Sequence, residues 1–141
     1  MTGLVAHKLQ EVVYAALAAD TLLMQRVTGV YDQPITGAAF PHVMMGDTTM
    51  SPGAVKDRHG ARITFDILIW SNEPSQMETK ELMALVDDVF QGNAMKADTF
   101  ELVQIRLQNA GVVRQFNEEG SLYRGRLSYS ATVYEREAII C

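Results

Sequence analysis

The side chains of this 141-residue chain that could do chemistry are its histidines, its neighbouring carboxylates and a few serines. The three histidines, His7, His42 and His59, lie far apart in the chain, and no cysteine stands near any of them. A structural zinc site needs about four ligands at characteristic spacings. We therefore predict no metal site, and we expect His42 to be a strand residue at a sheet edge or an interface.

The carboxylates and serines do not form a catalytic set either. Asp87 and Asp88 are adjacent, so on a helix they point roughly 100° apart and cannot act together as acid and base; we expect a solvated helix edge. Ser51, Ser71 and Ser75 have no histidine nearby in the sequence. No glycine-rich phosphate loop, nucleophile elbow or metalloprotease helix motif is present. The sequence predicts neither an enzyme nor a bound cofactor.

Length and composition predict one soluble domain that spans residues 1–141. The chain is 48% hydrophobic and 21% charged, as in ordinary globular proteins. A formal net charge of −5 argues against a dedicated nucleic-acid binder, which would carry a basic surplus on one face. No apolar run approaches the roughly 18 to 20 residues of a membrane helix, and no secretory signal is evident. The single cysteine, Cys141, is the last residue, so we expect no internal disulfide.

Apolar residues near the start of the chain repeat with the period of a helix. The stripe is Leu9, Val12, Val13, Ala16 and Leu17. Asp20 can cap a second, short helix, and Gly29 suits the end of that helix. A second stripe, which predicts a later helix that begins near Pro74 and Ser75 and ends at Gly92, consists of Leu82, Leu85, Val86, Val89 and Phe90.

Strand patterns fill most of the remaining chain. Pro41 opens a predicted strand from His42 to about Gly46, and residues 47–60 show no period and predict a long loop. Residues 61–69 alternate apolar and polar side chains. Near the strand end, Leu68 and Trp70 break this pattern and make the second face apolar, so that end should be covered on both sides. Asp66 lies on the polar face, and we expect it to pair with Arg124 or Arg126.

The last third predicts a hairpin. Residues 103–108 alternate, Asn109-Ala110-Gly111 should kink or bulge the strand, and residues 117–120 make the turn, with Gly120 where a positive φ is needed. The return strand should bury Leu127, Tyr129, Ala131 and Val133. These elements predict an α+β fold: a small antiparallel sheet with helices packed on one face and a long loop between the second and third major elements.

Two surfaces are candidates for contact with partners. The first combines the long loop with the acidic hairpin tip, which could dock on a basic surface; it consists of Met50, Pro52, Val55, Lys56, Arg58, His59, Glu118 and Glu119. The second is a polar face that the long strands would share if they are neighbours. Its basic residues are Arg62, Arg106, Arg124 and Arg126, accompanied by Gln104, Gln108, Ser128 and Thr132. Such a face could be a plain solvated surface, or it could turn towards a ring lumen or an adjacent subunit.

Several short segments, taken in order, resemble one family. They are Leu-Gln-x-x-Val-Tyr-x-x-Leu-x-x-Asp from Leu9 to Asp20, Val30-Tyr31-Asp32 with Pro34, the Phe40-Pro41 strand entry, the strand end from Ile67 to Ser71, and a final hairpin with glycine followed by an aromatic residue. This order resembles the small tail-completion proteins, also called tail terminators, of long, non-contractile-tailed phages and of gene transfer agents.

The resemblance implies a structural role. Proteins of this family form a homohexameric ring on the last ring of the tail-tube protein, stop tube polymerisation and present a surface to the head-completion (stopper) protein. The resemblance also implies transient, sequence-independent passage of DNA, no membrane contact, and a place in the virion tail or neck after assembly in the host cytoplasm. The alternatives are a head-tail connector (neck or stopper) subunit and a small α+β enzyme or ligand-binding domain.

Overall fold

The computed structural model describes residues 6–32, 37, 39–52, 60–92, 100–117 and 120–135. In chain order the elements are α1 (Ala6–Ala19), α2 (Thr21–Met24), β1 (Val30–Tyr31), β2 (His42–Pro52), β3 (Gly60–Ser71), α3 (Met77–Gly92), β4 (Phe100–Asn117) and β5 (Gly120–Glu135). The strands form one sheet in the order β1-β2-β3-β5-β4. Only the β1–β2 pair is parallel; the other three pairs are antiparallel.

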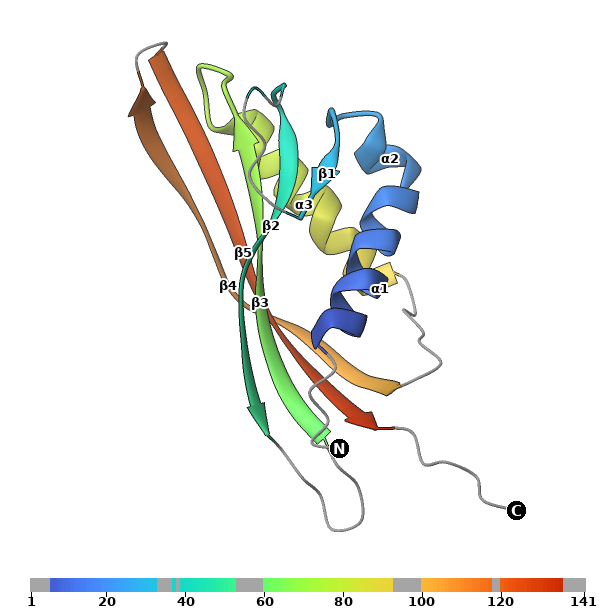
Figure 1. Ribbon diagram of the computed structural model, residues 1–141. Helices are drawn as coiled ribbons and strands as arrows, with labels where there is room; N and C mark the ends of the chain where they lie inside the picture. The colour runs from blue at the N-terminus through green and yellow to red at the C-terminus, as the bar shows by residue number, and fades with distance from the viewer. Residues whose placement is uncertain are drawn as a thin grey trace, which may run out of the picture.

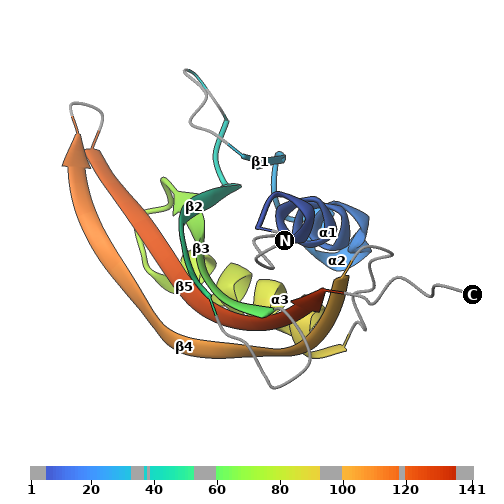
Figure 2. The same cartoon turned by 60° about the horizontal axis from the view of Figure 1, so that its bottom comes forward.

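The sheet is the main body of the molecule, and the predicted fold of a small sheet with helices packed on one face is wrong. Strands of 11, 12, 18 and 16 residues form a sheet that curls into a half-barrel, seen end-on in Figure 2, whereas the helices have 14, 4 and 16 residues. Irregular register between Met45 and Thr48 in β2, and at two places in β4, marks bulges. Since bulges bend a strand and increase its twist, they account for the curl.

The predicted long loop is shorter than expected because its first part continues β2. Residues 48–52 pair with β3 from Phe65 down to Ala61, although their side chains are exposed. That exposure removes the apolar alternation by which a strand is recognised in a sequence. Residues 53–59, which hold the rest of the predicted loop, lie outside the described residues.

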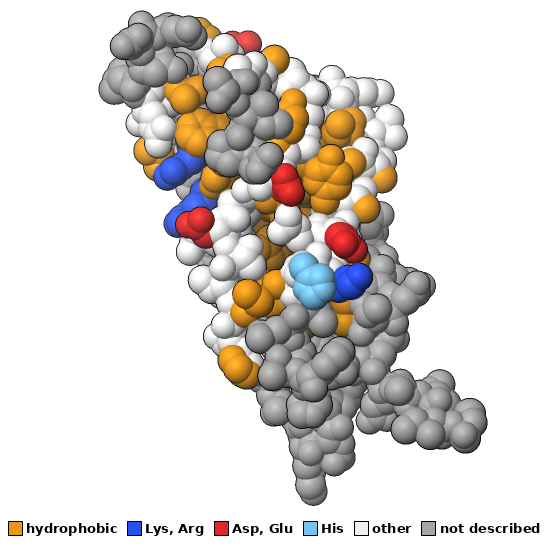
Figure 3. Space-filling view, viewed as in Figure 1, with side chains coloured by type: hydrophobic (Ala, Val, Ile, Leu, Met, Phe, Trp, Pro, Cys, Tyr) orange, Lys and Arg blue, Asp and Glu red, His pale blue; other side chains and the backbone are white. Residues whose placement is uncertain are grey.

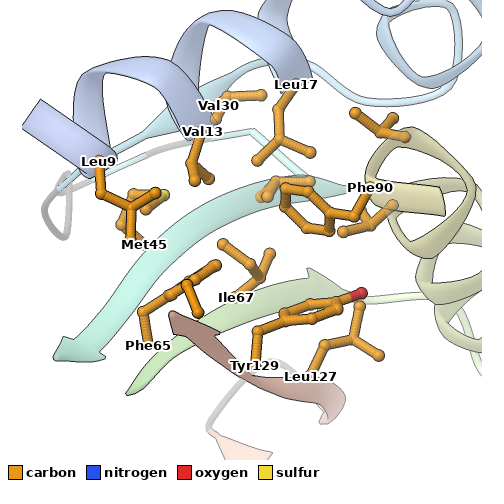
Figure 4. Close-up of a cluster of buried hydrophobic side chains, with 14 of the residues drawn as sticks. Leu9, Val13, Leu17, Val30, Met45, Phe65, Ile67, Phe90, Leu127 and Tyr129 are labelled. Atoms are coloured by element: carbon orange, nitrogen blue, oxygen red, sulfur yellow. The ribbon is translucent and has the colours of Figure 1, made fainter. Parts of the chain in front are cut away.

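Both long helices lie in the hollow of the curled sheet (Figures 1 and 2). The stripe of α1 is confirmed: Leu9, Val13 and Leu17 are buried and face Met45 and Phe65 of the sheet (Figure 4). The strand pattern is confirmed as well, because the odd-numbered residues of β3 from Ala61 to Ile69 are all buried. This alternation directs one face of the sheet to the helices and the other to the outside.

An aromatic cluster joins α3 to the centre of the sheet. The ring of Tyr129 stacks on Phe65 at 5.6 Å and meets Phe90 edge-on at 4.6 Å between ring centroids. The Tyr129 hydroxyl donates a 2.8 Å hydrogen bond to Asp87 Oδ1, and burial, followed by this bond, raises the pKa of Tyr129. The prediction that Asp87 is a solvated edge residue is therefore wrong: its carboxylate satisfies a buried phenol.

Local signals for the helix ends are partly confirmed. The Asp20 side chain caps α2 by accepting a 2.9 Å hydrogen bond from the Leu23 backbone N–H. Ser75 Oγ accepts from the Met77 N–H just as α3 begins. Gly29, however, does not end α2, because that helix is only four residues long and its C-cap is Gln25.

His42 lies in a cluster at the start of β2. Its ring meets Tyr31 and Phe40 at centroid distances of 5.7 and 5.2 Å, and its Nδ1 lies 3.1 Å from the Ala39 carbonyl oxygen. His42 is a strand residue, as the sequence predicted, and it is only 9% exposed. Burial lowers the pKa of His42 below its usual 6.5, and the hydrogen bond to Ala39 opposes that shift.

Helix α3 approaches β5 so closely that a Cβ at position 125 would displace side chains of the helix. A Cβ at Gly125 would lie 2.7 Å from Met83 Sδ and 2.8 Å from Thr79 Cγ2. We predict that Gly125→Ala lowers the free energy of unfolding by about 1–3 kcal/mol in a urea melt, because overpacking displaces α3. Gly111→Ala is the matched control: it lies in the same hairpin with nothing within 4 Å of its Cβ position. Equal effects of the two substitutions would contradict this reading.

The lowered pKa of His42 predicts a loss of stability in mild acid. The unfolded chain takes up a proton as the pH falls below 6.5, whereas the folded chain resists it. Stability conferred by the neutral ring is therefore full above pH 6.5 and is lost as the pH falls through the lowered folded value. Urea midpoints measured between about pH 7.5 and 5.5 should fall more steeply for the wild type than for His42→Gln. His7→Gln, on the exposed side of α1, is the control; a wild-type slope equal to that of His42→Gln would refute the prediction.

Candidate functional site

The outer, convex face of the sheet carries the predicted polar set. Strand register places Arg62 opposite Thr132 and Trp70 opposite Arg124 on β3 and β5, and it places Gln104 opposite Thr132 and Arg106 opposite Ser130 on β4 and β5. Arg126 shares this face, because it pairs with Leu68. Only Gln108 has no register partner; it lies at the irregularity between Leu107 and Asn109. The four arginines thus lie on one surface, and its role remains a prediction.

Hydrogen bonding on this face differs from the prediction. Asp66 pairs with neither arginine that was proposed for it; its Oδ1 accepts a 2.6 Å hydrogen bond from Ser128 Oγ. Ser128 was expected to be exposed but is buried. Arg126 reaches Asn109 Oδ1 only at 3.5 Å, a long contact on an exposed site. Among the described residues, Arg124 Nε is one of two buried side-chain polar atoms without a hydrogen-bond partner.

The loop and hairpin surface is only partly visible. Met50 and Pro52 are exposed at the end of β2, and Met50 is 47% exposed. Pro52 pairs with Ala61 at the start of β3, whereas Tyr123, near the hairpin turn, pairs with Ser71 at the end of β3. The two halves of the predicted partner surface therefore belong to opposite ends of the sheet. The remaining predicted residues lie outside the described part of the chain: Val55, Lys56, Arg58, His59, Glu118 and Glu119.

A groove that the sequence analysis did not find runs between α1 and β1. Its cavity volume is about 590 Å³. Its walls come from the side of α1 that faces away from the core and from β1 with the residue that follows it. Among the described residues, the lining consists of His7, Gln10, Glu11, Tyr14, Val30, Tyr31 and Asp32. Two carboxylates among tyrosines suit a cationic or peptide-like occupant better than an anion. The signal was present in the sequence as the outward face of the first helix, but nothing linked it to residues 30–32.

The two edges of the sheet have different surfaces. At one edge β1 has two residues and is flanked by the groove, and at the other edge β4 has 18 residues. In the described part of the chain no strand pairs with the outer side of either one. Leu107 and Val113 of β4 are 39% and 46% exposed. An open strand edge presents unpaired backbone donors and acceptors to a partner.

The described residues contain no cluster of metal-binding side chains. No group of three or more histidine, cysteine or acidic side chains within residues 6–32, 39–52, 60–92, 100–117 and 120–135 could hold a metal ion. Among the helices that are described, none is long and apolar enough to cross a membrane. What these described ranges offer is surface for protein contact: an arginine-bearing face, an acidic groove and two open edges.

Comparison with known proteins identifies the family. A family model described as Tail completion protein gp17 matches residues 11–134. Tail completion protein gp17 of Bacillus phage SPP1 is 26% identical over 117 residues, which are 79% of this chain and 87% of the phage protein.

Two solved structures share the fold. A chain in the virion of a native gene transfer agent (GTA) particle is 28% identical with a TM-score of 0.80, covering 93% of this chain and 98% of that chain. The structure of the bacteriophage SPP1 gp17 protein has 20% identity and a TM-score of 0.59, covering 98% and 95% of the two chains. The resemblance inferred from the sequence is confirmed: the chain belongs to the family of tail completion proteins described as gp17, which makes it a structural component of a virion tail.

Proposed function

We propose that this protein is the subunit of a homohexameric ring that caps the tail tube, ends tube polymerisation and provides the surface for head joining. The observation that carries the proposal is the likeness, at a TM-score of 0.80, to a chain in a gene transfer agent virion, which extends over 93% of this chain. A likeness of that extent involves the whole sheet and its helices, so it supports an equivalent structural place in the particle.

The geometry of the sheet suits a ring subunit. A subunit that repeats around an axis needs two different side surfaces that fit each other, and the β1 and β4 edges are two such unlike surfaces. It also needs two ends, one for the tube and one for the head. The β2 end, with exposed Met50 and Pro52, and the hairpin end lie at opposite ends of the strands.

The convex face supplies the polar surface that the ring requires. Arg62, Arg106 and Arg126 are exposed there, on a protein whose formal net charge is −5. In the ring this face would turn towards the lumen or towards an adjacent subunit. A few arginines can touch passing phosphates without sequence preference, while the overall negative charge prevents tight retention of DNA.

A subunit of the head-tail connector, such as a neck or stopper protein, is the alternative role in the same particle. The two roles differ in what their loss does to the tail. A connector joins finished parts, whereas a terminator also sets the end of the tube. Tail length in its absence therefore separates the two.

Loss of the protein should leave tails of uncontrolled length that are not joined to heads. Negative-stain microscopy of a deletion strain measures both properties, and the same strain complemented with the wild-type gene is the control. Tails of normal length that fail to join heads would assign the protein to the connector role. Tails of normal length that are joined to heads would end both readings.

Assembly should depend on the tube. A terminator must not close rings ahead of the tube end, so we expect a monomer or a weakly associating species alone and a six-fold ring in the presence of tail tube. Light scattering of the isolated protein checks its association state alone, and microscopy of its mixture with tail tube checks for the six-fold ring. A tight dimer that is unaffected by tail tube would contradict the proposed function.

A further inference from the structure

The two open edges of the sheet carry surfaces of opposite charge. We propose that the β4 edge of one copy docks in the groove between α1 and β1 of the next copy, so that the ring is built head to tail. The inference rests on the proposed ring function and adds to it the identity of the contact between subunits. In this proposal the groove is occupied by a second copy of this chain, not by a small molecule or another protein.

The groove supplies the acidic and aromatic half of the contact. Glu11 and Asp32 line it and are exposed, and Tyr14 is 42% exposed although it lies beside the buried stripe of α1. In the view of Figure 3, acidic and hydrophobic side chains lie over α1 and β1, with a histidine and a basic side chain beside them at the lower end of α1. A partly exposed aromatic ring flanked by charges is typical of interface anchors, which bury a large area at low entropic cost.

The β4 edge supplies the basic and aliphatic half. Gln104 and Arg106 are exposed on its convex side, and Leu107 is 39% exposed on the other side. These residues lie between the two bulges of β4, in a stretch that pairs regularly with β5. Since neighbouring residues of a strand point to opposite faces, this stretch can present arginine to one wall of a groove and leucine to the other.

The sizes of the two parts agree. The residues of α1 that line the groove run from His7 to Tyr14, which corresponds to about 12 Å at 1.5 Å per residue. An extended strand covers that length with about four residues at roughly 3.3 Å each. The stretch of β4 from Gln104 to Leu107, between the two bulges, has this length, so it can lie along the groove without the rest of the strand entering.

Charge complementarity selects a head-to-tail contact over a two-fold one. Four described arginines lie on the outer face of β3, β4 and β5: Arg62, Arg106, Arg124 and Arg126. The groove beside α1 instead carries the carboxylates Glu11 and Asp32. A symmetric dimer would bring like charges together, which is costly across an interface. A contact between the two unlike edges brings opposite charges together, and such contacts generate rings when the rotation closes.

Two charge-reversed proteins test the contact. The groove variant is Glu11→Arg with Asp32→Arg, and the strand variant is Gln104→Glu with Arg106→Glu. All four side chains are exposed, so thermal melts of both variants should match the wild type. Each variant is expressed alone, and then together with the other, in the deletion strain, and head-joined tails are counted by microscopy. Each variant alone should reduce that count at least about tenfold, because every subunit contact then opposes like charges.

Co-expression of the two variants should restore the count close to that of the wild type. In an alternating ring the arginine groove of one variant meets the glutamate strand of the other, and the unchanged groove meets the unchanged strand. Alternation closes in a ring with an even number of subunits, as the proposed hexamer has. The control variants are Glu73→Arg with Asp88→Arg for the groove and Lys80→Glu for the strand; these residues are exposed and lie on neither surface.

The outcomes separate the two proposals. If the deletion strain already makes head-joined tails of normal length, the proposed function fails. If each charge-reversed variant alone restores them fully, the function stands and the contact is wrong. If each fails alone and their co-expression also fails while the controls succeed, the two surfaces contact other partners, and the proposal that they bind each other is overturned.

Discussion

The fold depends on one constraint: the odd-numbered residues of β3 and β5 must be buried under the helices. Ile67 and Leu127 pair directly across the two central strands, and both are almost fully buried. A shift of one residue in either strand would exchange its buried and exposed faces. The same register that fills the core with Phe65 and Tyr129 therefore directs Arg62, Arg124 and Arg126 to the outside. The surface that we assign to assembly is fixed by the core, not by contacts of its own.

Close packing of α3 on β5 adds precision to this arrangement. Glycine at position 125 lets Thr79 and Met83 approach the strand, and the bond from Tyr129 to Asp87 ties the helix to the middle of the sheet. A buried phenol without a hydrogen-bond partner would be costly. This cost explains why the helix carries a carboxylate at position 87, which the sequence pattern alone would place in solvent. A rigid helix–sheet unit holds the edges of the sheet at fixed angles, as a subunit in a closed ring requires.

Local patterns in the sequence predicted single elements better than they predicted how the elements combine. The stripe that contains Leu9, Val13 and Leu17, the alternation from Ala61 to Ile69, and the positive φ of Gly120 are confirmed, because each depends on neighbours along the chain. The size and curl of the sheet were missed. They arise from bulges and from a part of β2 whose exposed side chains carry no strand pattern.

Prediction of the candidate sites was limited in the same way. The shared face of the arginines followed from alternation. The partners of Asp66 and Asp87, however, lie far away in the sequence: Ser128 is 62 positions from Asp66, and Tyr129 is 42 positions from Asp87. The acidic groove was missed because its two walls come from α1 and β1, which are separated in the sequence. Neither wall shows a distinctive motif: one is the outward side of an ordinary amphipathic helix, and the other is a two-residue strand.

An open strand of 18 residues is a hazard for a free protein, and β4 shows how this chain limits the hazard. Long exposed edges template unwanted pairing unless bulges, charges or a cover interrupt them. Strand β4 has two irregularities in its pairing and exposes Arg106 and Arg114. These features oppose indiscriminate pairing of two β4 edges, because like charges would meet along the contact. They do not oppose pairing with an acidic groove. The features that keep the free protein from aggregating would thus also select its neighbour in the proposed ring.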